Sequence, residues 1–163
     1  NKRLNMKKAA ILILALYANS VYTDEYIFFE STEALYNEVG KRSAKIGAFI
    51  KKHQLLQLLQ QEDGSPRLIA AIHELIQISE HELEDYPILK KQLLSDLWVD
   101  LASERFDAGD YAKSEYFCDL AIATDPENPL PYPAKAHFCR QAGNEAQAIA
   151  YEKIAKEKGI DRH

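Results

Sequence analysis

The sequence WVDLASERFDAGDY, at residues 98–111, predicts the end of one helix, a tight turn and the start of a second helix. Trp98 and Leu101 are large apolar residues and Ala102 is small, and their spacing places all three on one helix face. Gly109 suits the left-handed backbone conformation that often follows a helix. The stretch therefore predicts a helical hairpin.

The same pattern returns 34 residues later in the chain. Tyr132 takes the place of Trp98, and Gly143 takes the place of Gly109. Pro126 suits the end of the second helix of the first unit. Small residues that would let neighbouring helices approach closely occur in both units: Ala102, Ala121, Ala136, Ala148 and Ala155. Two units in register predict an all-α fold built from paired helices.

This pattern resembles the tetratricopeptide repeat, which has two antiparallel helices in 34 residues and is marked by W-x2-L-G-x2-Y and later by A, F, A and P. The resemblance covers about residues 95–162, with a first unit at 95–128 and a second at 129–162. Ser114 replaces the usual Ala of the pattern, and Ile160 stands in place of the last Pro. The resemblance implies helical hairpins that stack as a short right-handed α-solenoid.

The rest of the chain is predicted to be helical and to belong to the same single domain, residues 1–163. We expect N-terminal helices within residues 6–61 and an irregular helical region at 65–94. Because repeats of this kind need about three stacked units, these helices are expected to complete the stack. No further polar helix follows the second unit, so the last repeat is expected to present an apolar edge to a partner or to a second copy in a homodimer.

Acidic residues and a glycine mark the first of these helices. Asp24 and Glu25 suit the positive end of a helix dipole, and Gly40 suits a helix end, which together predict a helix over 24–39. A further helix, or a continuation of the first, is predicted over 41–61 from the helical spacing of its apolar residues.

A serine and two prolines mark the next helix starts. Ser65 is expected to be the N-cap of a helix that begins at Pro66 and reaches about Glu82. Pro87 is expected to begin the helix after it. No stretch alternates between apolar and polar residues over enough positions to predict a strand.

The composition is that of an ordinary globular chain with an acidic balance. Of the 163 residues, 47% are hydrophobic and the formal net charge is −5, which argues against a nucleic-acid-binding protein. Residues 1–53 contain nine Lys or Arg and five Asp or Glu, whereas residues 54–163 contain eleven and twenty. The two parts could attract each other or present faces of opposite sign. The simpler interpretation is solvated charged helix faces.

The residues that could carry chemistry do not form a known catalytic or metal-binding pattern. Cys118 and Cys139 lack zinc-site spacing and are expected to be structural. His73 begins an H-E-x-x-H pattern, but Gln77 stands where the second His is required. Residues 40–43, GKRS, resemble the end of a phosphate-binding loop without its upstream glycine or its strand. We therefore predict no enzyme activity, no metal site and no cofactor.

The N-terminal residues decide the expected compartment. Two lysines precede an apolar run at residues 9–18, as in a secretory signal peptide. This run is too short to span a bilayer, which needs about 20 apolar residues, so no membrane span is predicted. A buried first helix is favoured, which implies a cytoplasmic protein. If residues 6–20 act as an export signal, the protein is instead periplasmic or secreted.

In the family that the sequence resembles, the first helix of each repeat lines a concave groove. The resemblance therefore implies these partner-binding residues: Asp96, Val99, Ser103, Phe106, Asp107, Leu130, His137, Arg140 and Gln141. An exposed Phe106 near Arg140 would suit an extended or helical peptide with apolar anchors. Val99 and Ser103 occupy two positions at which some family members carry a clamp for a C-terminal carboxylate, so that clamp is not expected. The simpler interpretation of each residue is an ordinary solvated helix face.

The resemblance implies a non-catalytic protein-interaction module, a scaffold or adaptor, whose partner is another protein or a peptide. One alternative is a chaperone of the kind that serves type III secretion, because those small proteins also carry tetratricopeptide repeats and an N-terminal helical part. Another alternative is an exported envelope assembly protein with the signal-like segment at its N-terminus. An enzyme on a helical scaffold is a third class, which a pocket with convergent histidines and carboxylates would favour.

Overall fold

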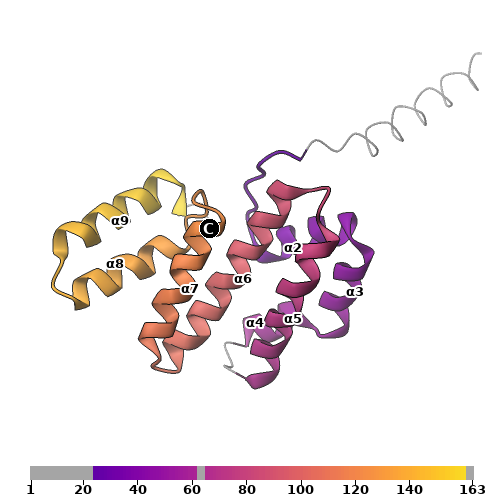
Figure 1. The fold of residues 1–163 in the computed structure, drawn as a ribbon, viewed down its shortest axis with the longest axis horizontal. Coiled ribbons are helices and arrows are strands. Elements are labelled where there is room, and N and C mark those ends of the chain that lie inside the picture. Colours follow the sequence, from indigo (N-terminus) through magenta and orange to yellow (C-terminus); the bar gives the residue numbers. More distant parts are fainter. Residues whose placement is uncertain (1–23, 62–64, 161–163) are drawn as a thin grey trace, which may run out of the picture.

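The computed structural model describes residues 24–61 and 65–160, and within these ranges it contains eight α-helices and no strand. The helices follow one another from the N-terminal end to the C-terminal end of the molecule (Figure 1). Their bounds are α2 Thr32–Arg42, α3 Ala44–Lys52, α4 Leu55–Gln60, α5 Pro66–Glu82, α6 Pro87–Asp107, α7 Tyr111–Thr124, α8 Pro131–Gln141 and α9 Glu145–Glu157. The prediction of an all-α fold is confirmed for the described residues.

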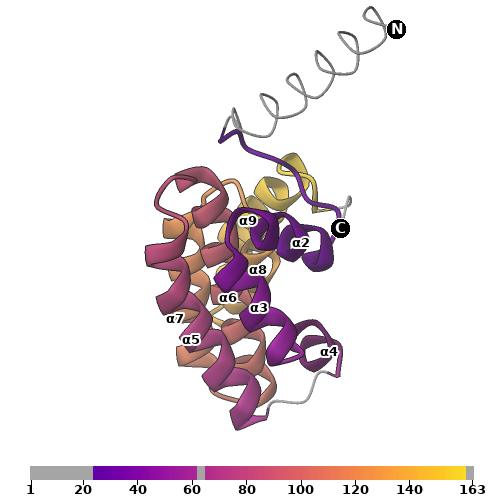
Figure 2. The same ribbon diagram turned by 90° about the vertical axis from the view of Figure 1, so that its right-hand side faces the viewer.

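The helices pack in pairs. Helix α6 packs against α5 and α7, and α8 packs against α7 and α9. Figure 1 shows α8 and α9 at one end, α6 and α7 in the middle, and α2 to α5 at the other end. Figure 2, turned by 90°, shows α2, α3 and α4 on one side of the long helices α5 and α6. The N-terminal helices therefore add a layer beside the hairpins.

The two glycine turns have the conformation that the sequence predicts. Gly109 has φ +80° and Gly143 has φ +79°, values in the left-handed region that favours glycine. The helix that follows each turn is capped in the same way, because Asp110 and Asn144 accept hydrogen bonds from backbone N–H groups of α7 and α9. The expected small residues are all buried between helices: Ala102, Ala121, Ala136, Ala148 and Ala155.

The predicted starts of α5 and α6 are confirmed. Ser65 Oγ accepts a hydrogen bond from Leu68 N at 3.2 Å, and Pro66 is the first helical residue. Helix α6 begins at Pro87 and runs without a break to Asp107, so it extends well before the expected start of the first repeat unit.

The helix predicted over 24–39 is wrong in its first half. Residues 24–29 have no regular secondary structure, and α2 begins only at Thr32. Asp24 caps a different helix: its carboxylate accepts hydrogen bonds from Ile88 N at 2.7 Å and Leu89 N at 3.1 Å, at the start of α6. The carboxylate does meet the positive end of a helix, as expected of its charge, but that helix lies some sixty residues further along the chain.

The single helix predicted over 41–61 is also wrong. Ser43 separates α2 from α3 and caps α3 by accepting a hydrogen bond from Ile46 N. Gln54, with φ 49°, then separates α3 from α4. Gly40 lies inside α2 instead of ending it, and the Cα atoms of Gly40 and Gly47 face each other across the contact between α2 and α3.

One hydrophobic core joins the N-terminal helices to the hairpins. Leu35, Ile46 and Leu75 belong to the same buried cluster as Leu101 and Phe138. Trp98 is partly buried and stacks on the ring of Phe117, with centroids 5.7 Å apart. At the C-terminal side, Lys135 of α8 forms ion pairs with two carboxylates of α7, Glu115 and Asp119.

Residues 6–20, with their signal-like pattern, lie outside the described residues. No helix in the described ranges is both long and apolar enough to cross a membrane.

Candidate functional site

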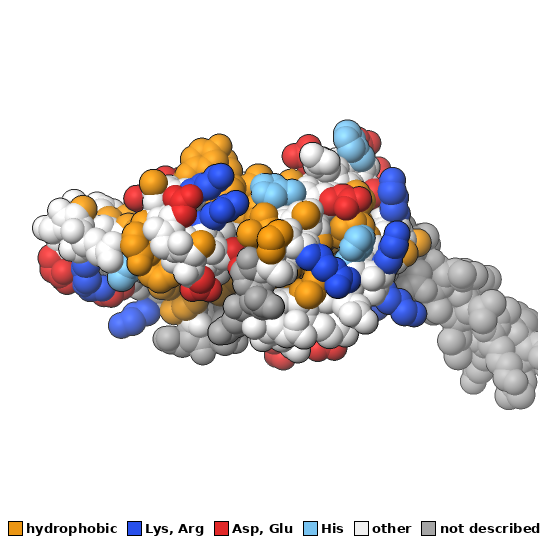
Figure 3. Space-filling model, turned by 90° about the horizontal axis from the view of Figure 1, so that it is seen from below, with side chains coloured by type: hydrophobic (Ala, Val, Ile, Leu, Met, Phe, Trp, Pro, Cys, Tyr) orange, Lys and Arg blue, Asp and Glu red, His pale blue; other side chains and the backbone are white. Residues whose placement is uncertain are grey.

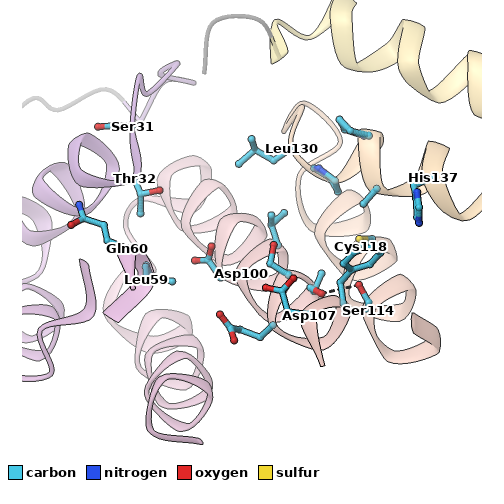
Figure 4. A pocket seen from close by; sticks show the side chains of 18 of the residues that line it. Ser31, Thr32, Leu59, Gln60, Asp100, Asp107, Ser114, Cys118, Leu130 and His137 are labelled. Carbon is cyan, nitrogen blue, oxygen red and sulfur yellow. Dashed lines mark hydrogen bonds between the residues drawn. The ribbon is translucent and has the colours of Figure 1, made fainter. Parts of the chain in front are cut away.

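An open groove of about 910 Å³ lies between the N-terminal helices and the two hairpins (Figure 4). One wall comes from α2 and α4, the floor from α6 and α7, and the other wall from the start of α8. We name it the central groove. It is lined by Ser31, Thr32, Glu33, Leu56, Leu59, Gln60, Val99, Asp100, Ala102, Ser103, Glu104, Phe106, Asp107, Ser114, Cys118, Leu130, Pro131, Pro133, Ala134 and His137.

The structure brings six of the nine expected partner-binding residues together in this groove: Val99, Ser103, Phe106, Asp107, Leu130 and His137. The other three do not line it. Asp96 lies in a smaller neighbouring pocket, and Arg140 and Gln141 lie at the far end of α8.

Asp96 takes part in a partly buried polar contact outside the central groove. Its Oδ1 accepts a hydrogen bond from Asn128 Nδ2 at 2.9 Å. Burial raises the pKa of the Asp96 carboxyl to about 7, although the hydrogen bond from Asn128 opposes this shift. Asp96 therefore joins α6 to the loop between α7 and α8.

Arg140 has its partners on α9 and not in the central groove. Its guanidinium pairs with Glu145, with Nε and Oε1 3.1 Å apart, and also with Glu152. The hydrogen bond from Arg140 lowers the pKa of the Glu152 carboxyl. Arg140 does not line the central groove, because its guanidinium is paired along the hairpin of α8 and α9, and its expected surface with Phe106 stays a prediction.

An aromatic cluster closes one end of the groove. Phe106 is 36% exposed, so it is not a core residue. Its ring meets the rings of Tyr111, His137 and Phe138 edge-on, with centroid distances of 5.1, 5.4 and 6.2 Å. Such contacts hold the Phe106 ring in place while part of it remains open to a ligand.

Several groove residues could not be recognised from the sequence alone. Leu56, Leu59 and Gln60 reach the groove because α4 folds back beside α6, and no local pattern indicates this packing. Asp100 and Glu104 did carry a signal, because Asp96, Asp100 and Glu104 recur every fourth residue and must share a helix face.

The Asp100 carboxyl is the least satisfied group of this face. Its Oδ2 atom is hidden from solvent and has no hydrogen-bond partner among the described residues. Burial, followed by the negative charges of Asp96 and Glu104, raises the pKa of this carboxyl well above its usual range. In Figure 4 the Asp100 side chain points from α6 into the space between the labelled Leu59 and Leu130.

Two of the hydroxyl and thiol side chains that line the groove, Ser114 and Cys118, have structural roles. Ser114 Oγ donates a hydrogen bond to the carbonyl oxygen of Ala102 at 2.7 Å and so joins α7 to α6 (Figure 4). Burial raises the pKa of the Cys118 thiol to about 11, which disfavours the reactive thiolate. Across residues 24–61 and 65–160, no group of three or more His, Cys, Asp or Glu side chains could hold a metal ion.

Comparison with known proteins adds no relative to this description, because no family model, no curated protein and no solved structure matches the chain. The functional argument therefore rests on the groove itself.

Proposed function

We propose that this protein is a non-catalytic interaction module that holds a segment of another polypeptide in the central groove. The observation that carries this proposal is the groove: an open space of about 910 Å³ with apolar side chains on both walls and polar groups between them. Sites that bury small ligands have volumes of roughly 300–1,000 Å³. This space suits several side chains of one peptide segment better than a folded domain.

The helical pairs support a repeat architecture for the binding surface. We interpret the pairs α6–α7 and α8–α9 as two tetratricopeptide-type hairpins in a short right-handed solenoid, with α2 to α5 as the additional stacking surface. This interpretation is supported by positive-φ glycines 34 residues apart, at Gly109 and Gly143, and by the buried alanines between the helices. In such stacks the first helices line the concave side, and here α6 and α8 both contribute to the groove.

The shape of the groove favours a helical or extended segment with apolar anchors. Leu56 and Leu59 stand on one wall, and Leu130 and Pro133 stand on the other. Phe106 remains partly exposed at one end. An amphipathic helix or an extended peptide places apolar side chains at spacings that can reach such anchor points together.

Selection of peptides from a random displayed library tests the proposal. The bait is the full chain, and the matched bait is Ser103→Trp, which fills the groove from an exposed position on α6. We expect peptides that bind the unmodified protein and lose binding to Ser103→Trp. Ala150→Trp, at an exposed position of α9 outside the groove, should keep binding. Peptides that bind all three proteins equally would show that the groove is not the binding site.

A further inference from the structure

The acidic and basic side chains that line the central groove are carboxylic acids and one histidine. Four lining residues are carboxylic acids: Glu33, Asp100, Glu104 and Asp107. Among the described residues, no lysine or arginine lines the groove, and the imidazole of His137 is its basic lining side chain. A groove with apolar walls and an acidic floor attracts positive charge and disfavours an acidic segment.

The basic side chains of the described residues lie elsewhere. Figure 3 shows several Lys and Arg side chains at the end of the molecule that α2 and α3 form in Figure 1, and others nearer the middle and the opposite end. Lys41 and Lys51 line a separate pocket there. Lys135 and Arg140 are occupied by carboxylates of α7 and α9. The described part of the protein therefore supplies no ion-pair partner for Asp100.

Asp100 is the group that points to a ligand of a particular chemistry. Among the described residues, its Oδ2 atom is hidden from solvent without a hydrogen-bond donor, and the nearby hydroxyl of buried Tyr36 also lacks a partner there. A buried carboxyl without a partner destabilises the free protein, and a charge-assisted hydrogen bond from a bound cation would remove this penalty. Glu104 lies one helical turn further along α6, so a single guanidinium or ammonium group can approach both carboxyls.

We infer that the segment held in the central groove carries a Lys or Arg side chain between apolar anchors, and that this cation binds Asp100 and Glu104. The inference rests on the proposed function and adds the chemistry of the partner to it. The apolar anchors contact the two walls, where Leu59 faces Leu130 across the floor (Figure 4). The cation sits between them and meets the carboxyls of α6. The partner is thus a basic amphipathic segment of another polypeptide.

Peptides selected on the full chain provide the test. We expect their sequences to be enriched in Lys or Arg relative to the unselected library, next to apolar residues. Replacement of that Lys or Arg by Gln in a synthetic copy should weaken binding by roughly tenfold or more, as expected for loss of one charge-assisted hydrogen bond. In the Asp100→Asn and Glu104→Gln proteins, the difference in affinity between the selected peptide and its Gln copy should be smaller. Asp85→Asn, an exposed carboxylate outside the groove, should leave it unchanged.

The outcomes separate this inference from the proposed function. Peptides that require an open groove but show no preference for Lys or Arg would overturn the inference and leave the proposed function standing. Peptides that bind the Ser103→Trp protein as tightly as the unmodified protein would overturn both the inference and the proposed function. Because the Lys-to-Gln change is made in the peptide, the result does not depend on how the protein variants fold.

A second copy of the chain is the competing occupant, and sedimentation velocity tests it. If the protein sediments as a monomer in the absence of peptide, the result supports a different polypeptide as the occupant of the groove. A dimer that Ser103→Trp dissociates would show that another copy fills the groove, and would overturn the assignment to a different polypeptide.

Discussion

The side-chain amide of Asn128 donates a hydrogen bond to Ser95 Oγ at 2.9 Å, which joins the loop after α7 to the middle of α6 across 33 positions of the chain. Ser95 Oγ in turn donates to the carbonyl oxygen of Ala121, and Asn128 also donates to Asp96. Asn128 Oδ1 accepts a hydrogen bond from Leu130 N, just before α8. The Asn128 amide and the Ser95 hydroxyl together therefore connect three successive helices next to the central groove.

Asn128→Ala should destabilise the protein by about 1–3 kcal/mol, because the change leaves buried polar partners without hydrogen bonds. The measurement is urea denaturation followed by circular dichroism. Asn37→Ala is the control, since Asn37 is exposed within α2 and its loss should change the free energy of unfolding by less than about 0.5 kcal/mol. Equal effects of the two changes would contradict the role of Asn128.

Asp24→Ala should destabilise the protein by about 0.5–2 kcal/mol, the range found when helix N-caps are removed. The reason is that Tyr86, the N-cap residue of α6, makes no side-chain capping bond, and Asp24 accepts from Ile88 and Leu89 in its place. Glu25→Ala removes the same charge at the next, exposed position and should have little effect. Thermal denaturation of the two variants compares them directly.

Gly47→Leu should destabilise the contact between α2 and α3 by about 2 kcal/mol or more, the cost of overpacking a close contact. A Cβ atom at Gly47 would lie 3.2 Å from the Cα atom of Gly40, and that neighbour is backbone that cannot rotate away. Ala48→Leu adds bulk at the next, exposed position of α3 and should leave stability nearly unchanged. A fully stable Gly47→Leu protein would show that the two helices can separate without cost.

The free energy of unfolding should decrease as the pH rises from about 4 to about 7, in part because of Asp96. Burial raises the pKa of this carboxyl from 3.8 to about 7 in the folded protein. Over this range the unfolded chain has already released the proton while the folded protein retains it, so rising pH favours the unfolded chain. Asp96→Asn should show a smaller decrease, measured by urea denaturation at both ends of the range. Identical pH profiles for the two proteins would contradict the assignment.

Phe106→Ala should weaken the binding of selected peptides by at least tenfold, because an exposed aromatic anchor is lost from the end of the groove. Arg140→Ala should leave peptide affinity unchanged, since this guanidinium is paired with Glu145 and Glu152 on the far side of α8. Fluorescence anisotropy of a labelled peptide measures both. Loss of binding in Arg140→Ala alone would restore the surface expected from the sequence.

Local signals in the sequence predicted the features that depend on neighbours along the chain. Ser65 and Pro66 begin α5, Pro87 begins α6, and the glycine turns at 109 and 143 adopt positive φ. Each of these is a property of a few consecutive residues, because caps and turns are set by local hydrogen bonds and by allowed backbone angles. The same reasoning failed for Asp24, whose partners at the start of α6 lie 64 and 65 positions away.

The sequence by itself determined that the described part of the chain is mainly helical, where the hairpins turn and which small residues lie between helices. Only the tertiary structure decided that Gly40 contacts Gly47 instead of ending a helix, that α4 supplies a groove wall, and that the Asp100 Oδ2 atom is hidden from solvent with no hydrogen-bond partner among the described residues. The physical reason is that periodicity and capping act over a turn or two of helix. The burial of a carboxyl depends instead on which helices, distant in the sequence, pack around it. In this protein that packing places the carboxyls of α6 at the floor of the groove.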